Sequence, residues 1–551
     1  MPVKNFALLS FEDRVLLRDE FAPSGSLPWL LRDHADLLFP FWLLMGWKGQ
    51  TKVGRDGWPA DRMMALLLLR HSEAGLTRVG SVRRANSDAS WRAALRLPWS
   101  EKPPTEKTVR EFEAFLKQPH PDIERPRFEL AFEHWTRLAL EAGVVGGDPV
   151  WVADSTPMWC FGAVLGTVRL LGDGLRSLAR RWARARKVTL QTVALEWGDA
   201  LLLAKSTKGF FEGTDWADTG ARSTVLTSLV TSVTQATERI LADLNEVREN
   251  KRKGLARRCR NLLRVVNEDL EPTENGGLRV AQRRSARRLI SHTDPEAQHF
   301  RKSKSKVCSG FKIHAFGDAV SGLFLSLSVT PGGLHDSTQL VPLLVRAKAL
   351  HHQIAEVLAD AAYGGMQVRS DVMQACGVKV ISPPGGDTRK GEGLGKSDFD
   401  IDFDALTATC PGGVVTSDWR WNAGGKVRNF VWAKGSEETC TCCGACPAHR
   451  PRKLKSGRQG APHRRLQLHA EEQGLRAVRV EWEKPETRTR YRRRGEGERL
   501  MREVTRRGAR RAGAWGLANA SLQAHAAAAV SNLTVLAKHL AAHQSRQEKA
   551  A

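Results

Sequence analysis

The order of strand-like and helix-like stretches between residues 310 and 382 constrains the fold more than any other feature. GFKIHAFGDAV and GLFLSLSVTPGG predict two strands joined by a turn around residues 318–322. They are followed by a helix in STQLVPLLVRAKAL, a buried strand in AEVLADAAYGG, a helix in MQVRSDVMQAC and a strand in VKVISPP. An earlier strand, VWVAD, precedes a long basic insert. This order predicts the α/β class with a mixed sheet flanked by helices.

The rest of the chain divides by composition. Residues 1–125 carry apolar positions at helical spacing and predict a helical N-terminal domain. Residues 165–290 predict a basic, mostly helical insert. A Cys- and Arg-rich insert over 383–487 begins with a Gly/Pro-rich linker. The predicted α/β core therefore comprises 148–382 and 488–540, with 541–551 as a tail.

The charge balance points to a polyanionic partner. The 551 residues carry 85 Lys and Arg against 60 Asp and Glu, a net charge of +25. Residues 450–513 alone hold 21 basic and 8 acidic residues, about half of the surplus. Such an excess is typical of nucleic-acid binding, and the basic insert is expected to contact DNA phosphates unless it is only a solvated helical face.

Targeting and redox features favour the cytoplasm. The N-terminus lacks the apolar core of a signal peptide, and no apolar run is long enough to span a membrane. Nine cysteines in a chain of this length are expected to be reduced thiols. We therefore expect a cytoplasmic, nucleoid-associated protein with no membrane contact.

Two aspartates stand at the ends of predicted buried strands. Asp154 ends VWVAD and Asp360 ends the strand in AEVLAD. A carboxylate at such a sheet edge is held rigidly and opens to solvent, although aspartate also ends strands simply as a turn former. The chain has two tyrosines, and one of them, Tyr363, follows Asp360 by three residues.

The second tyrosine opens the arginine-dense run YRRRGEGERLMREVTRR. Tyr491, Arg494, Glu498 and Thr505 are spaced three, four and seven residues apart, which places them on one face of a helix. One face would then carry a hydroxyl, a guanidinium and a carboxylate. A solvated basic helix with an incidental glutamate is the alternative.

Three blocks together resemble the signature of bacterial insertion-sequence transposases of the DDE type. They are VWVADST, LADAAYGG and YRRRGEGER, the last with the spacing Tyr-x2-Arg-x3-Glu. The resemblance covers about residues 148–540, and the N-terminal helical region also looks like the leading domain of that family. It implies an RNase-H-like fold with a mixed five-stranded sheet, interrupted by the helical insert and by the Cys/Arg-rich insert before the last catalytic helix.

The resemblance also implies a site. Asp154, Asp360 and Glu498 would be the catalytic carboxylates and would hold two Mg²⁺ or Mn²⁺ ions, which suit hard oxygen ligands. The implied reaction is metal-dependent cleavage and strand transfer of double-stranded DNA at terminal inverted repeats and a target, by a homodimer in the DNA complex. The residues expected to contact DNA are Tyr363, Tyr491, Arg492, Arg493, Arg494, Arg506 and Arg507.

One position departs from the family pattern. The motif usually continues with Lys or Arg seven residues past the glutamate, and Thr505 stands there. Two other functions therefore stay open, a DNA-binding relic or repressor without catalysis and an RNase-H-like nuclease without joining activity.

A cysteine cluster suggests a second metal. Cys440, Cys443 and Cys446 have the two-residue gaps of zinc ligands, with reduced thiols in a small β-rich insert as the alternative. The HDS stretch at 335–337 is interpreted as a polar turn after a strand, with His-Asp metal chemistry as the alternative.

Overall fold

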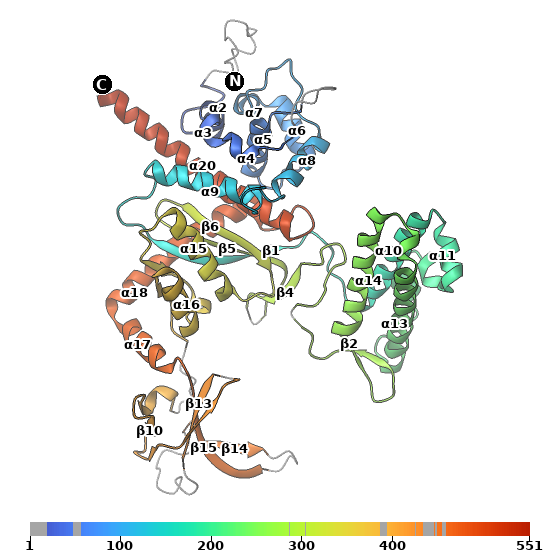
Figure 1. Ribbon diagram of the computed structural model, residues 1–551, viewed down its shortest axis with the longest axis vertical. Helices are drawn as coiled ribbons and strands as arrows, with labels where there is room; N and C mark the ends of the chain where they lie inside the picture. Colours follow the sequence, from blue (N-terminus) through green and yellow to red (C-terminus); the bar gives the residue numbers. More distant parts are fainter. Residues whose placement is uncertain are drawn as a thin grey trace. The chain divides into compact units, whose positions relative to one another are not determined.

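The computed structural model, shown in Figure 1, forms two compact units that share one strand. It describes residues 19–47, 57–285, 287–303, 305–385, 394–424, 426–432, 446, 449–453 and 459–550. The first unit comprises Met1–Gly147, Ser155–His335 and Arg499–Ala551, and the second comprises Asp148–Asp154 and Asp336–Glu498. The boundary between them passes through strand β1 (Trp151–Trp159).

The first unit contains the antiparallel part of the sheet. Strands β5 (Val307–Asp318) and β6 (Leu323–Pro331) form the hairpin that the sequence predicts. A short strand, β4 (Gln298–Arg301), pairs with the start of β5. The second half of β1 lies next to β5. Directly after β1, the backbone N–H of Cys160 donates to Ser309 O at 3.1 Å.

The second unit contains the parallel part. The first half of β1 pairs in parallel with β7 (Glu356–Leu358), which pairs in parallel with β8 (Lys379–Ile381). Helices α15 (Leu340–Leu350) and α16 (Met366–Cys376) occupy the two predicted helical stretches. The predicted mixed, RNase-H-like sheet with strands β6, β5, β1, β7 and β8 is thus confirmed, with β4 as an additional short strand.

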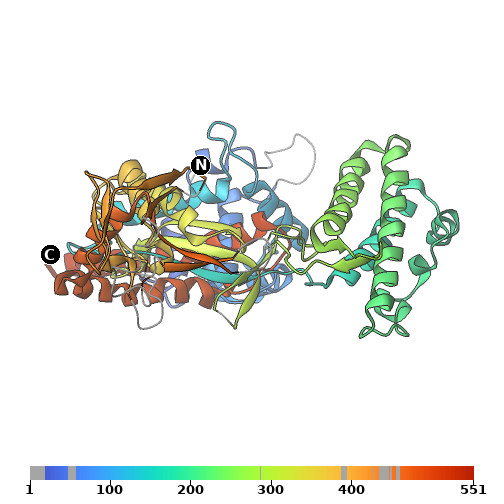
Figure 2. The same cartoon turned by 90° about the horizontal axis from the view of Figure 1, so that it is seen from below.

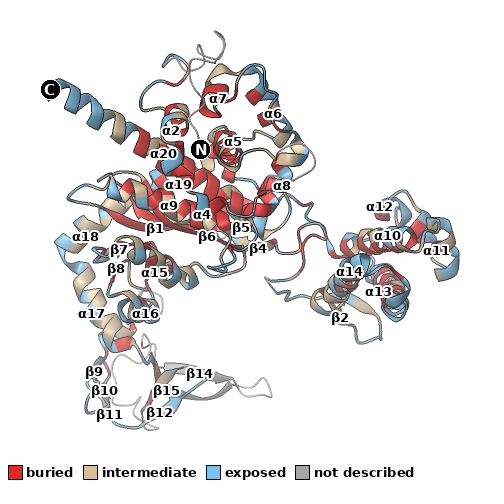
Figure 3. Ribbon diagram, turned by 45° about the horizontal axis from the view of Figure 1, so that its top comes forward, coloured by how far each residue is buried: buried red, intermediate tan, exposed pale blue. Residues whose placement is uncertain are grey.

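Helices cover the antiparallel part of the sheet within the first unit. Both α9 (Arg127–Glu141) and α20 (Leu517–Ala550) pack on β6, and α20 also packs on α5 (Ala60–Ser72). The buried Asn532 amide joins these elements, because it accepts from Phe324 N at 2.8 Å and donates to Thr136 Oγ1 at 3.0 Å. Figure 3 shows the buried residues of α20 gathered along its first part, whereas its C-terminal part is exposed.

The remaining N-terminal helices confirm the expected helical region. Their starts follow ordinary capping rules, since side chains of Ser26, Thr77, Asp88 and Thr105 accept hydrogen bonds from the first turns. These helices are α2 (Leu27–Asp33), α3 (Ala35–Leu38), α4 (Phe41–Leu44), α6 (Arg78–Ser87), α7 (Ala89–Ala94) and α8 (Glu106–Leu116).

The predicted basic insert is helical and has its own core. Its three long helices, α10 (Thr167–Arg186), α13 (Thr219–Ala242) and α14 (Glu249–Asp269), pack against one another, as the green segment of Figures 1 and 2 shows. Buried Leu175 and Trp182 belong to the apolar core between them. The shorter elements are α11 (Leu190–Trp197), η2 (Ala200–Leu203), α12 (Thr207–Phe210), η3 (Leu244–Glu246), β2 (Leu270–Pro272) and β3 (Leu278–Val280).

The Cys/Arg-rich insert lies in the second unit and is rich in β structure. One small sheet has three strands, β9 (Asp400–Asp402), β10 (Thr407–Thr409) and β11 (Val415–Thr416). The other has four, β12 (Trp419–Asn422), β13 (Val427–Val431), β14 (His449–Lys453) and β15 (Gln459–His469). After them come α17 (Glu472–Glu483) and α18 (Pro485–Arg492), which lead into the arginine-dense run.

Candidate active site

Asp154 lies inside strand β1. The strand continues to Trp159, so the prediction that it ends at Asp154 was wrong. The reason is that β1 has two sets of partners. Its first half is bound to β7, and its later residues continue in the first unit, where Trp159 N donates to Arg510 O at 2.9 Å.

Asp360 follows the neighbouring strand. Strand β7 ends at Leu358, and Asp360 keeps an extended backbone and caps the short η5 (Ala361–Tyr363), accepting from Ala362 N at 2.9 Å. Val152 and Leu358 are direct partners in the parallel pair. Each aspartate lies two residues beyond its partner residue, and residues two apart in an extended chain share a face of the sheet. Both aspartates therefore leave the same face of two neighbouring strands, and such strands are about 4.8 Å apart.

Glu498 is brought to this face by a glycine. Gly497 is buried, and a Cβ placed on it would lie only 2.5 Å from Val152 Cγ1. The chain between η8 (Arg493–Gly497) and α19 (Glu498–Val504) therefore packs directly on the side chain of β1 that precedes Asp154 by two residues. Glu498 itself is exposed. The backbone that leads to Glu498 therefore packs on β1 within the second unit, and a shared site of Glu498 with Asp154 and Asp360 stays a prediction.

The three carboxylates do not form a ready metal cage. Throughout the described ranges, no group of three or more His, Cys, Asp or Glu side chains is arranged to hold a metal ion. Asp154 is engaged by an arginine and Asp360 by the backbone of η5. The oxygen-only donor set nevertheless has the chemistry that Mg²⁺ or Mn²⁺ prefers. The residue types therefore fit such ions, and their assignment as ligands stays a prediction.

Arg494 is the partner of Asp154. Its Nη2 lies 3.3 Å from Asp154 Oδ1, and the two side chains are 22% and 18% exposed. An ion pair at this depth is screened by solvent less than a surface pair. The predicted helical face of the arginine-dense run does turn toward the sheet at this residue.

Tyr363 lies beside the same acidic residues but is fully buried. Burial raises the pKa of its hydroxyl well above 10, and the carboxylates of Asp336, Asp360 and Asp154 raise it further. The hydroxyl oxygen has no hydrogen-bond partner among the described residues. Its predicted role in contacting DNA would require this buried ring to become accessible.

Asp336 is an acidic residue of this region that the sequence interpretation missed. It opens η4 (Asp336–Gln339), directly after the segment that follows β6. Among the charged neighbours of Tyr363 it raises the pKa of the hydroxyl most. The signal was present in the HDS stretch, for which a polar turn was preferred over His-Asp metal chemistry.

Tyr491 is half-buried against a tryptophan of α17. Its ring meets that of Trp482 edge to face, with centroids 4.8 Å apart. Burial raises the pKa of the Tyr491 hydroxyl, Arg494 lowers it, and Asp360 and Asp154 raise it. Tyr491 and Arg494 therefore both lie close enough to the aspartates to interact with them electrostatically, as their shared helical face predicts.

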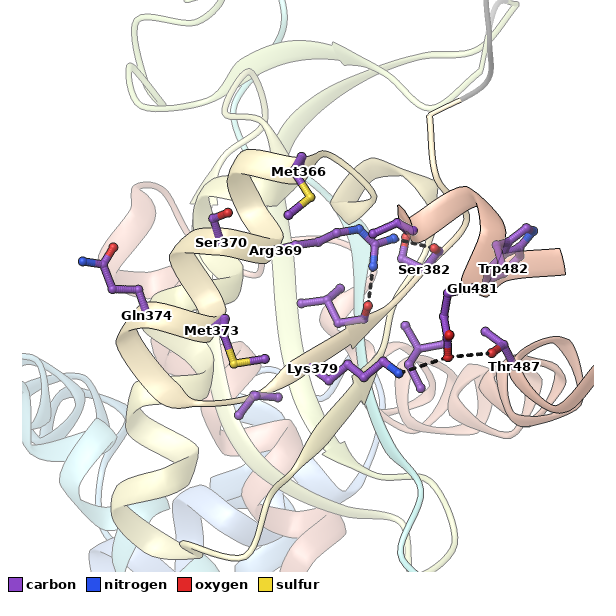
Figure 4. Close-up of a pocket in the computed structure, with 14 residues that line it drawn as sticks. Met366, Arg369, Ser370, Met373, Gln374, Lys379, Ser382, Glu481, Trp482 and Thr487 are labelled. Atoms are coloured by element: carbon purple, nitrogen blue, oxygen red, sulfur yellow. Dashed lines mark hydrogen bonds and ion pairs between the residues drawn. The ribbon is translucent and has the colours of Figure 1, made fainter. Parts of the chain in front are cut away.

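A second arginine, Arg369, supports the backbone around Asp360 through Ser382, and Figure 4 shows the side chains of Arg369 and Ser382. Arg369 on α16 points to the end of β8, where its guanidinium donates to Val380 O and, at 2.6 Å, to Ser382 O. Ser382 Oγ in turn donates to Asp360 O at 2.6 Å. This chain forms one wall of a mostly apolar cavity of about 490 Å³ between α16, β8, α17 and α18. Sequence inspection gave no signal for Arg369, because its partners are backbone carbonyls.

The other arginines predicted to contact DNA differ in their surroundings. Arg492 is exposed, and Arg493 is paired with Asp148 at 2.6 Å. In the first unit, Arg506 is paired with Glu503 at 2.7 Å, whereas Arg507 is buried. Exposed cations of this run can reach a phosphate directly, and Arg507 can do so only within a cavity.

Thr505 is turned back onto its own helix. Its hydroxyl donates to Met501 O at 3.0 Å and to Arg502 O at 3.1 Å. The residue that replaces the family's cation thus ends the regular part of the helix instead of extending outward. The chain kinks just after it, at Gly508, where φ is +90°.

The predicted zinc ligands lie mostly outside the described residues. This applies to Cys440 and Cys443, whereas Cys446 is described as a buried free thiol packed with Phe430 and Trp432. Zinc binding by this cluster stays a prediction.

Within the described parts of the chain, no helix combines the length and the apolar character that crossing a membrane requires.

Comparison with known proteins gives one match. Residues 287–533 match the family described as transposase DDE domain. The match includes Asp360, Arg494 and Glu498, whereas Asp154 precedes it and is separated from it by the helical insert; β1 reaches the matched region through its pairing with β7. Neither the curated proteins nor the solved structures gave a significant match. Together with the sheet order, this match over 247 of the 551 residues supports a DDE-type transposase of the RNase-H-like superfamily.

Proposed function

We propose that this transposase cleaves DNA at the ends of an insertion sequence and joins the cut strands to a target. Water would attack the phosphorus at the element end and release a 3′-hydroxyl, which then attacks a target phosphodiester. Asp154, Asp360 and Glu498 would hold two Mg²⁺ or Mn²⁺ ions. When bound, such ions stabilise the charge on the attacking and leaving oxygens.

One packing relationship carries the assignment of these three residues. Val152 pairs with Leu358 on one side and contacts Gly497 on another, and each of these three residues lies one or two positions before a proposed carboxylate. Strand β1, its parallel neighbour β7 and the chain that enters α19 therefore meet at Val152. This supports a shared role for residues that are far apart in the sequence.

The protein side chains around the carboxylates would orient them. Arg494 holds Asp154, and Ser382 holds the carbonyl of Asp360. Exposed cations such as Arg492 would bind the phosphates of the flanking duplex, which positions DNA without reading its sequence. We further propose a homodimer in the DNA complex, because both ends of an element must be brought together, and a cytoplasmic, nucleoid-associated location.

Thr505 favours a second candidate. A DNA-binding relic or repressor would keep the cations and lose strand cleavage, and the hydroxyl of Thr505 is bonded to its own helix where the family has a cation. A cell-based excision assay separates the two. A donor plasmid carrying the reading frame with its flanking repeats should lose the segment when the intact chain is expressed. Repeat binding without any excision product would instead support the relic.

A further inference from the structure

A cavity of about 500 Å³ lies within the first unit, apart from the carboxylates. It is formed by the end of α5, the segment that follows it, the start of α8 and the turn after α19. We call it the arginine cavity after four of its lining residues, Arg70, Arg78, Arg507 and Arg511.

The charges around the arginine cavity leave it positive. Its two acidic lining residues have cations of their own: Glu73 lies 3.4 Å from Arg84, and Glu106 lies 3.8 Å from Arg110. One further carboxylate, that of Glu113, is shared by Arg70 and Arg78.

The remaining polar lining adds no negative charge. Burial and the charges of Arg70 and Arg78 hold the pKa of His71 well below 6.5, so His71 is neutral. Arg511 is exposed and forms no ion pair with any residue that the structure describes. An anion entering the cavity therefore meets uncompensated positive charge.

Arg507 is the residue that points most directly to a ligand. It is 9% exposed, and its Nε has no hydrogen-bond partner among the described residues. Its closest carboxylate oxygen, on Glu503, is 3.6 Å away. Burying a guanidinium without full hydrogen bonding is costly, and an anion bound in the cavity would offset that cost.

The backbone fixes Arg507 in place. Gly508 has φ +90°, a conformation that favours glycine, and a Cβ there would lie 3.1 Å from Gly75 N. Gln523 Nε2 donates to Gly508 O at 2.9 Å. The turn is thus held both by α20 and by the loop after α5, so the cavity wall is built and not incidental.

Aromatic side chains stand beside the cations. Phe161 lines the cavity and is 45% exposed, and its ring meets that of Trp515, which is 54% exposed, at 5.7 Å between centroids. Exposed aromatic faces next to arginines are the combination with which proteins bind single-stranded nucleic acid. The cavity volume lies within the range of about 300–1,000 Å³ that is usual for small-ligand sites.

We propose that the arginine cavity binds one unpaired nucleotide of a DNA strand. Its phosphate would lie against Arg507 and Arg511, and its base against Phe161. An unpaired nucleotide is favoured over duplex because an aromatic ring stacks only on a base that has left its own stack. This inference rests on the proposed function in that DNA is the substrate.

The test is fluorescence anisotropy with the full-length protein in EDTA, at several salt concentrations. The probes are a labelled single-stranded oligothymidylate and a labelled duplex of the same length. Arg511→Gln should weaken single-strand binding and lower the slope of log K against log salt by about 0.7, the value for one phosphate contact of a single strand. Phe161→Ala should weaken single-strand binding roughly tenfold and leave duplex binding unchanged.

The neighbouring arginine provides a matched control. Arg510 is also exposed but does not line the cavity, since it donates to Thr156 Oγ1 at 3.2 Å. Arg510→Gln removes the same charge and should change single-strand binding less than twofold. The proposal attributes binding to cations that line the cavity and not to the net charge of the protein. Equal effects of Arg510→Gln and Arg511→Gln would overturn the proposal, as would Phe161→Ala with unchanged single-strand affinity.

A free nucleotide is the competing source of the same chemistry. Thymidine monophosphate that binds the wild-type protein more tightly than the oligothymidylate does would overturn the DNA assignment. Arg507→Gln should also weaken binding of the single strand. Should that variant fail to fold, Arg507→Lys, which keeps the charge but loses the fork of donors, should bind the single strand more weakly than the wild type does. The two proposals can fail separately. Variants of the arginine cavity can still be assayed for strand cleavage, and a wild-type protein that cleaves no DNA can still be assayed for single-strand binding.

Discussion

Arg494 Nη2 lies 3.3 Å from Asp154 Oδ1, although 340 residues separate the two in the sequence. The pair ties the arginine-dense run to strand β1 at the residue that the family resemblance marks as catalytic. Because a helical insert and most of the sheet intervene in the chain, only the folded sheet brings these residues together.

Arg494→Gln removes the charge of this pair and keeps a hydrogen-bonding amide. We expect the free energy of unfolding to fall by about 1 kcal/mol, since the pair is partly exposed, and strand cleavage to fall far more because Asp154 is no longer oriented. Urea unfolding and a cleavage assay measure the two effects. Arg502→Gln, at an exposed position of α19, is the control and should leave both nearly unchanged. Full cleavage by Arg494→Gln would contradict an orienting role.

Gly497→Ala tests the close approach of the helix to the sheet. The added methyl would lie 2.5 Å from Val152 Cγ1, so the variant should lose about 1–3 kcal/mol of stability. Val152→Ala removes the two opposing methyl groups but keeps Cβ, 3.0 Å from the added methyl, so the double variant should recover part of the loss. Gly495→Ala is the matched control, because a Cβ at Gly495 would meet no atom within 4 Å. Urea denaturation of the four variants checks this, and identical losses at the two glycines would rule out the packing.

The two tyrosines predict a particular response to alkali. The pKa of Tyr363 is raised well above 10 by burial, and that of Tyr491 is also raised by burial. A hydroxyl whose folded-state pKa is raised contributes stability that is complete below the unfolded pKa of about 10 and is lost as pH rises through the folded pKa. Native protein should therefore form tyrosinate at higher pH than the urea-denatured chain.

Absorbance at the tyrosinate band provides the measurement, since the chain has only these two tyrosines. Tyr491→Phe isolates the signal of Tyr363, whose ionisation should coincide with unfolding. If tyrosinate formed with the same midpoint pH in the native and the denatured protein, neither hydroxyl would be buried as described. Tyr363→Phe should cost little stability, because the hydroxyl has no described hydrogen-bond partner.

Much of the fold could be predicted from local patterns. The strands and helices between residues 307 and 381 were recognisable because apolar residues there repeat with the period of each element. The end of β1 was not. Asp154 followed by Ser, Thr and Pro has the composition of a turn, but pairing on the far half of the strand overrides that preference.

The site shows the same division. The spacing of Tyr491, Arg494 and Glu498 predicted a common face. Tyr491 and Arg494 do interact electrostatically with the aspartates. The run is helical but is tightened at Arg493–Gly497, which a regular helical wheel does not anticipate. Arg369 and Gly497 act through backbone carbonyls and close packing, and neither leaves a pattern in a single sequence.

The most direct test of the account is strand cleavage by Glu498→Gln. The change keeps the size of the side chain but removes the negative charge proposed to bind metal, so cleavage of an end-bearing duplex in Mg²⁺ should collapse. DNA affinity, measured by gel shift at several salt concentrations, should persist, because loss of a negative charge does not weaken cation–phosphate contacts. Glu496→Gln, an exposed glutamate two residues earlier that pairs with Arg493 at 3.2 Å, should cleave like the wild type. Full cleavage by Glu498→Gln, or equal loss in both variants, would contradict Glu498 as the third catalytic carboxylate.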